Sequence, residues 1–242
     1  MRVFTLCLVI RICFFAGVCF SQEYPRWFLH QGELKGSDFA IGYANASGLS
    51  DSSKSYARIN AKENALIYRG VNISGGELFW STEGGTYWLG TNVIEKVIPE
   101  RETFVPKLKL LELYESIKLS IVLIGDSENV IPLEMNQVIK PSQAAPAWIE
   151  SIPTESKAVY AVGIAPDYYY ESSSWQEAER VMRKNLARSF FVSIKMLGKK
   201  DINEGQSMKK TEVNIDLYNI LVVERWWDME NRIYYVLGKI EL

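Results

Sequence analysis

The sequence predicts an α+β protein built from two tandem modules, each with one helix packed on a small, mainly antiparallel sheet. The first observation behind this prediction is that residues recur at a fixed offset of 121 positions without a gap. The second is that each copy runs from a short strand into a helix and then into further strands. The recurring pairs are Pro25/Pro146, Trp27/Trp148, Ala40/Ala161, Gly42/Gly163, Ala44/Ala165, Ser52/Ser173, Ser53/Ser174, Ala57/Ala178, Asn64/Asn185, Val71/Val192 and Ile73/Ile194. Identities in register over this length indicate a duplicated structural unit.

The first 21 residues differ in composition from the rest of the chain. Arg2 and Arg11 are their only charges, the remainder is almost entirely apolar, and small residues precede Gln22. A basic N-terminal region, a short apolar segment and small residues at the cleavage site are typical of a secretory signal peptide. A transmembrane helix would need about 20 uninterrupted apolar residues, and Arg11 interrupts this run. We therefore expect a signal peptide at 1–21, a first module at 22–140 and a second at 141–242.

All three cysteines of the chain, Cys7, Cys13 and Cys19, lie in this leader. Cleavage after Ser21 would leave a mature protein without disulfides, thiol catalysts or thiolate metal ligands. Cys19 also raises the alternative of a bacterial lipoprotein, in which the lipidated cysteine becomes the first residue. Val18 is a poor match for the small residue expected just before such a cysteine, so the sequence favours cleavage without a lipid anchor.

The charge balance argues against nucleic acid as a partner. The chain has 27 basic and 29 acidic side chains, a formal charge of −2, and removing Arg2 and Arg11 with the leader makes this −4. Nucleic-acid-binding proteins carry a basic excess on at least one face. Each module is long enough to bury its own core, so we expect residues 141–242 to fold alone.

Each module begins with Pro-x-Trp and continues with a strand of alternating small residues. These strands are expected at 39–44 and 160–165, where Ala-x-Gly-x-Ala leaves one face open to close approach by another element. Helices are expected at 52–69 and 173–197, with Asp51, Ser52 and Ser53 as N-caps in the first, and Ser174 with Glu177 as a capping box in the second. Small residues on one face of each helix predict tight packing on the sheet.

Strands follow each helix. In the first module, glycines from Gly75 to Gly90 predict a hairpin turning at Gly84-Gly85, and strands are expected at 107–113 and 117–124. In the second, one strand is expected at 212–223, and a turn at 228–231 then closes a hairpin with residues 232–237. Residues 140–145 have the composition of an interdomain linker.

This order of motifs resembles the twenty-kilodalton lipoprotein family. The motifs are Pro-x-Trp, Ala-x-Gly-x-Ala, a serine-capped alanine-rich helix, and a terminal Trp-x-Asp followed by Tyr-Tyr-Val-Leu. That family shares its fold with the N-terminal module of a flagellar assembly protein. The second half matches from Pro146 to Ile240, whereas the first half matches well only from Pro25 to Ile73. The resemblance implies a non-catalytic module of the cell envelope, on the periplasmic side and often associated with the outer membrane.

The residues give no catalytic, cofactor or metal site. His30 is the only histidine and has no cysteine partner, so a zinc site is not expected. No Gly-x-Ser-x-Gly or phosphate-binding glycine motif is present. Glu224 and Asp228 could serve in acid–base chemistry, but solvated positions at a strand end and in a turn are the favoured interpretation.

Two asparagines occupy the same position on the small-residue faces of the two helices. A buried amide there must find hydrogen-bond partners, because leaving it unpaired costs about 1–3 kcal/mol. A structural hydrogen bond from Asn64 and Asn185 to neighbouring backbone is favoured over contact with a ligand.

Aromatic residues give the clearest indication of binding. Tyr168, Tyr169 and Tyr170 stand in the predicted strand-to-helix loop of the second module, whereas the equivalent residues 47–49 are Ser-Gly-Leu. The three tyrosines could bind protein, stack on glycan or cover the protein's own core. Trp80, Tyr87 and Trp88 raise the same question for the glycine-rich hairpin. Trp226 and Trp227 should point to opposite faces of their strand.

From these observations we expect an exported, non-catalytic protein of the periplasm or of the periplasmic face of the outer membrane. Its expected role is scaffolding or assembly through contacts with other envelope proteins, without a cofactor. The alternative is a periplasmic protein that binds a solute or glycan in a cleft between the modules or on the aromatic loop.

Overall fold

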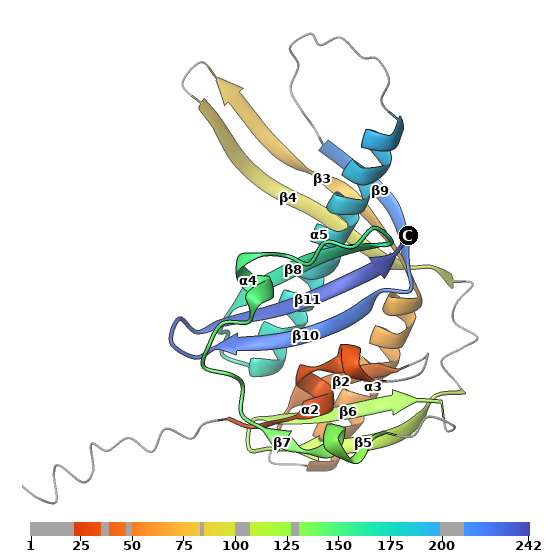
Figure 1. Ribbon diagram of the computed structural model, residues 1–242, viewed down its shortest axis with the longest axis vertical. Helices are drawn as coiled ribbons and strands as arrows, with labels where there is room; N and C mark the ends of the chain where they lie inside the picture. The colour runs from red at the N-terminus through yellow and green to blue at the C-terminus, as the bar shows by residue number, and fades with distance from the viewer. Residues whose placement is uncertain are drawn as a thin grey trace, which may run out of the picture.

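The computed structural model confirms the α+β class, with helices packed on small antiparallel sheets (Figure 1). The structure describes residues 22–34, 39–46, 50–82, 85–99, 107–126, 131–198 and 211–242. The leader with its three cysteines and residues 47–49 lie outside these ranges. The signal peptide and the absence of a lipid anchor on Cys19 therefore stay predictions.

The first sheet and its helix come entirely from the first half of the chain. The sheet has the order β2 (Ala40–Asn45), β6 (Leu119–Gly125) and β5 (Lys109–Glu115), with every pair antiparallel. Helix α3 (Ser50–Arg69) packs on β2 and β6. Every residue of β6 is buried, because this central strand packs against α3 on one face and against a large hydrophobic cluster on the other.

The second sheet repeats this arrangement with residues of the second half. Its order is β8 (Ala158–Pro166), β11 (Ile233–Glu241) and β10 (Leu221–Asp228), again antiparallel throughout. Helix α5 (Glu171–Gly198) packs on β8 and β11. The short helices α2 (Arg26–Leu29) and α4 (Ala147–Glu150), which carry the two Pro-x-Trp motifs, are also 121 residues apart.

The predicted close approach between helix and small-residue strand is present in both halves. A Cβ atom built on Gly42 would lie 2.0 Å from the backbone nitrogen of Ala61, and one on Gly163 would lie 1.9 Å from the carbonyl oxygen of Ala178. The helices therefore lie directly on these glycines, where no larger residue fits.

A third sheet contains strands of both halves. Its order is β4 (Gly85–Val97), β3 (Gly70–Thr82) and β9 (Thr211–Tyr218), and in Figure 1 its β3–β4 hairpin extends away from the other two sheets. The expected single strand at 212–223 is wrong, because the chain turns at Asn219, whose φ of 52° is left-handed. The residues before this turn pair with the first half, in β3, and those after it form β10.

The beginning of the described chain packs on both halves. Strand β1 (Tyr24–Pro25) pairs with β7 (Val138–Ile139), which follows the 3-10 turn at Leu133–Asn136. Helix α2 and the 3-10 turn Gln31–Glu33 contact β10. Buried side chains of both halves form one large hydrophobic cluster, in which Trp175 contacts the rings of Tyr24, Phe28 and Tyr234.

Both helices begin two residues earlier than expected, and the capping box is not formed. The Ser174 hydroxyl accepts a hydrogen bond from the Tyr168 backbone nitrogen at 2.8 Å. Glu177 pairs instead with Arg180. The Tyr170 carbonyl already accepts bonds from the nitrogens of Ser173 and Ser174, so the first turn starts upstream of the serine that the sequence pattern favoured.

These contacts argue against the expectation that residues 141–242 fold alone. In that fragment β9 would lose its partner β3, and buried Arg225 would lose the Phe28 carbonyl and the Gln31 side chain, which accept its hydrogen bonds at 2.7 and 3.0 Å. We expect the isolated fragment to show no cooperative thermal transition by circular dichroism, whereas co-expression with residues 22–140 should restore one. A sharp transition of the fragment by itself would contradict this.

Candidate functional site

The tyrosine loop, residues 167–170, connects β8 to α5 and exposes three consecutive aromatic side chains. Tyr168 is 44% exposed, Tyr169 94% and Tyr170 54%. The rings of Tyr169 and Tyr170 meet edge to face with their centroids 4.8 Å apart. The sequence left open that these tyrosines cover the protein's own core. Their exposure does not fit that interpretation.

Hydrogen bonds hold both ends of the tyrosine loop in place. The backbone nitrogen of Asp167 donates to the Arg232 carbonyl at 3.0 Å, and the Tyr168 nitrogen is bound by Ser174. At the start of α5, the Ser172 nitrogen and hydroxyl donate to Asn45 Oδ1, which belongs to the other half of the chain. The exposed rings are thus presented from a fixed backbone, so less conformational entropy is lost when a partner binds.

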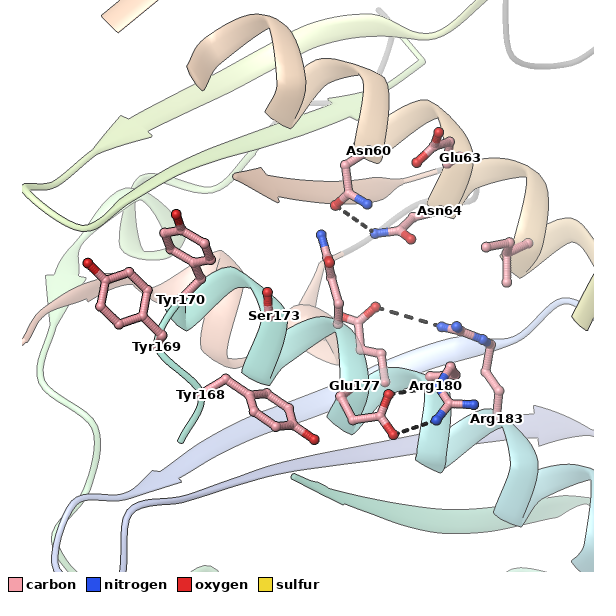
Figure 2. A pocket seen from close by; sticks show the side chains of 13 residues that line it. Asn60, Glu63, Asn64, Tyr168, Tyr169, Tyr170, Ser173, Glu177, Arg180 and Arg183 are labelled. Carbon is pink, nitrogen blue, oxygen red and sulfur yellow. Dashed lines mark hydrogen bonds and ion pairs between the residues drawn. The ribbon is translucent and has the colours of Figure 1, made fainter. Parts of the chain in front are cut away.

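A groove of about 720 Å³ lies between α3 and α5, with the tyrosine loop at one end (Figure 2). Figure 2 shows Tyr169 and Tyr170 together at this end, while the Tyr168 ring extends along α5 toward Glu177. The volume falls within the range of about 300–1,000 Å³ that is usual for small-molecule sites. The groove is lined by Asn60, Glu63, Asn64 and Ile67 of α3, the three tyrosines, and Ser173, Gln176, Glu177, Glu179, Arg180 and Arg183 of α5.

Both arginines of this groove form ion pairs, Arg180 within the groove and Arg183 with Glu95 outside its lining. Arg180 donates to both carboxylate oxygens of Glu177, at 2.7 and 2.6 Å. Arg183 forms an ion pair of 2.8 Å with Glu95 on β4, and its side chain is only 6% exposed. The arginines are therefore already neutralised, so the groove suits an uncharged, hydrogen-bonding partner better than an anion.

The two asparagines make the structural bonds that the sequence favoured. Asn64 Nδ2 donates to the carbonyl of Ile41 at 2.8 Å, and Asn185 Nδ2 donates to that of Val162 at the same distance. Both bonds tie a helix to the small-residue strand beneath it. Asn64 also lines the groove, beside Asn60, whose Oδ1 accepts from the Tyr43 backbone nitrogen.

A second hollow of about 530 Å³ lies on the N-terminal side of α5 and shares the tyrosine loop with the groove. Both halves of the chain contribute to it. Its lining consists of Asn45, Ala46, Lys118, Asp167, the three tyrosines, Glu171, Trp227, Arg232 and Tyr234. Burial raises the pKa of Glu171, an effect that hydrogen bonds from Tyr24 and other donors only partly offset.

Beneath the groove, Glu179 lies at the centre of a buried polar cluster. Its carboxylate accepts hydrogen bonds from Arg225 at 2.6 and 3.1 Å and from the Tyr68 hydroxyl. Burial and the negative charge of Glu179 both raise the pKa of Tyr68 and keep it in the neutral, donating form. Because Tyr68 lies on α3 and Glu179 on α5, the cluster joins the two helices that wall the groove.

The other residues weighed for chemistry have structural roles. His30 Nδ1 lies 3.5 Å from Glu224 Oε1, and the other oxygen of Glu224 accepts from the Trp148 indole at 2.8 Å. Asp228 caps the β10–β11 turn, and backbone and side-chain hydrogen bonds from Asn231, with a further one from Glu230, lower its pKa. Among the described residues, no three His, Cys, Asp or Glu side chains come together as a metal site requires.

The remaining aromatic predictions have mixed outcomes. Trp226 is buried and its indole donates to the Ser142 carbonyl, whereas Trp227 lies on the opposite face, half-buried and stacked on Tyr234. The side chains of Trp80, Tyr87 and Trp88 lie outside the described part of the structure. Neither hollow could be located from the sequence, because both form between segments far apart in the chain. The sequence suggested only an unplaced cleft between the modules, as an alternative, together with the tyrosines that lie at the common edge of the two hollows.

Among the helices in the described part of the chain, none combines the length and the apolarity that a membrane span requires. Comparisons with family models, with curated proteins and with solved structures found no match to this chain.

Proposed function

We propose that this is an exported, non-catalytic protein of the cell envelope that acts in scaffolding or assembly by binding another protein at the tyrosine loop. The observation that carries the proposal is the exposure of three consecutive tyrosines on a hydrogen-bonded loop beside a groove. Tyrosine is enriched in protein interfaces because its ring gives a large apolar contact area and its hydroxyl a hydrogen bond.

The envelope location rests on the sequence. The basic and apolar leader, the absence of cysteine after it and the resemblance to the twenty-kilodalton lipoprotein family all support export to the periplasm or to the periplasmic face of the outer membrane. The partner in this proposal is another envelope protein.

The groove itself supports a second candidate, the binding of a solute or glycan. Its volume suits a small molecule, and its amides and hydroxyls are the groups that bind neutral polar ligands. In this case the tyrosines would close one end of the site rather than form the centre of an interface.

The two candidates can be separated by replacing Tyr168, Tyr169 and Tyr170 together with serine. We expect the triple variant to lose envelope-protein products in site-specific cross-linking, since a few aromatic anchors usually contribute most of the binding energy, about 2 kcal/mol or more each. The melting temperature should change little, because the three side chains are exposed.

Tyr56→Ser provides the matched control, because Tyr56 is 64% exposed on α3 and lies outside both hollows. It should leave the cross-linked products unchanged. If the triple variant keeps these products but loses binding of a neutral oligosaccharide, the second candidate replaces the first. A large loss of stability in the triple variant would show instead that the tyrosines support the fold.

A further inference from the structure

The second hollow differs from the groove in how far its positively charged side chains are exposed to solvent. In the groove, Arg180 and Arg183 are held by carboxylates of the protein. In the hollow, Lys118 is exposed and forms no ion pair within 4 Å with any described residue, although its charge acts to lower the pKa of the buried Glu171 carboxyl. Arg232 is paired with Asp167, yet its side chain is 72% exposed. The hollow therefore presents two cations to solvent, one from each half of the chain.

Arg232 is held in a defined position. Its Nε and Nη2 atoms donate to Asp167 Oδ2 at 2.9 and 2.6 Å, a pairing that does not use Nη1. Its backbone has a φ of 57°, in the left-handed region that non-glycine residues rarely adopt. Backbone strain of this kind is often found at binding sites, where it fixes a side chain in the orientation that binding needs.

The negative groups of the hollow are turned to partners within the protein. Asp167 is bound by Arg232, as described above. Glu171 accepts from the Tyr24 hydroxyl at 2.6 Å and from the Trp175 indole at 3.4 Å, and both donors belong to the hydrophobic core. Lys118 and the Nη1 atom of Arg232, which the pairing with Asp167 does not use, thus keep hydrogen-bonding capacity for an anionic ligand.

The uncharged lining adds a second requirement. Half-buried Trp227 stacks on buried Tyr234, with ring centroids 5.6 Å apart and planes at 18°, and the three tyrosines of the tyrosine loop also line the hollow. The Asn45 amide also lines the hollow. Amides and phenols can bind the hydroxyls of a sugar, and aromatic faces pack against its C–H face, a contact that a small inorganic anion cannot make.

We infer that the hollow between Lys118 and Arg232 is a binding site for an anionic saccharide, a sugar ring that carries a carboxylate or a phosphate. Arg232 and Lys118 bind the anionic group, and the aromatic lining contacts the ring. This site shares the tyrosine loop with the proposed protein contact, but it depends on Lys118 and Arg232, which the protein-binding proposal does not use.

Binding can be measured with the full chain by isothermal titration calorimetry and by the change in tryptophan fluorescence. The probes are glucuronate, glucose 6-phosphate, glucose and inorganic phosphate. We expect glucuronate or glucose 6-phosphate to bind at least about tenfold more tightly than glucose and than phosphate, because only the charged sugars satisfy both parts of the site. The stronger of the two charged sugars identifies the anionic group.

Two variants test the residues. Arg232→Asn removes the guanidinium but keeps a residue that tolerates the left-handed backbone, and Lys118→Gln removes the other cation. Each should weaken binding of the charged sugar by about tenfold, whereas Arg180→Gln in the groove should not. Arg232→Lys should recover part of the affinity, which a purely structural role of Arg232 would not predict.

Three results would overturn the inference. The first is equal affinity for glucose and the charged sugars, and the second is equal affinity for inorganic phosphate and the charged sugars. The third is the absence of binding by any probe at millimolar concentration while the wild-type melting curve shows a folded protein. None of these results bears on the protein cross-linking of the tyrosine variant, so the two proposals can fail separately.

Discussion

Replacing Gly163 with alanine should prevent folding or lower the free energy of unfolding by more than about 3 kcal/mol, at or beyond the upper end of the usual cost of overpacking. The added Cβ would lie 1.9 Å from the Ala178 carbonyl oxygen and 2.3 Å from the Met182 backbone nitrogen. Both atoms belong to the backbone of α5, so the whole helix must move away from β8 to relieve the contact. Urea denaturation followed by circular dichroism measures the loss.

Gly238→Ala is the matched control for this effect. Its Cβ would lie 2.3 Å from the sulfur of Met182, also far inside van der Waals contact, but this sulfur is the flexible end of a side chain that can adopt another rotamer. We expect a loss of about 1–2 kcal/mol. Gly42→Ala should behave like Gly163→Ala, because it meets the backbone of α3 in the same way. Equal losses for Gly238→Ala and Gly163→Ala would show that helix position is not the cause.

These glycines also show what the sequence could predict. The pattern consists of a strand with Ala-x-Gly-x-Ala, followed by a helix that carries small residues and one asparagine on a single face. It strongly favours packing of the helix directly on the strand. Local patterns of this kind predicted both helices, the small-residue strand that each helix covers, and the backbone bonds of Asn64 and Asn185. Each depends on residues within one segment or on two segments close in sequence.

The features that the sequence did not predict depend on contacts between distant segments. Residues 212–223 alternate like one strand, and the break at Asn219 appears only because β9 pairs with β3, more than a hundred residues earlier. The groove and the second hollow likewise form where the two halves meet. The tyrosine loop was identified because consecutive aromatic residues in a loop are unusual in any fold.

Replacing Arg225 with methionine should lower the free energy of unfolding by about 3–5 kcal/mol, because breaking a buried ion pair leaves an unpaired charge. The Arg225 side chain has no exposed surface, and it donates to Glu179, to the Phe28 carbonyl and to Gln31 Oε1. Its guanidinium also lies 4.6 Å from the centroid of the Phe28 ring. Methionine matches much of its length but supplies none of these hydrogen bonds.

Arg26→Met is the control that shows whether the loss of stability in Arg225→Met comes from burial of the ion pair or from loss of any ion pair. Arg26 and Glu33 are 3.0 Å apart, but their side chains are 37% and 48% exposed. A pair of this kind contributes about 0–1 kcal/mol, because water solvates both charges when the pair is broken. Equilibrium denaturation in urea should therefore rank Arg225→Met far above Arg26→Met.

A double variant identifies the source of the cost. If the uncompensated Glu179 carboxylate causes the loss in Arg225→Met, then adding Glu179→Leu should recover part of the stability, and the two losses should not be additive. Recovery would remain incomplete, because Tyr68 and Arg183 also use this carboxylate. Additive losses would instead indicate that Arg225 acts through Phe28 and Gln31, which join the beginning of the described chain to β10, and that Glu179 stabilises the helix pair independently.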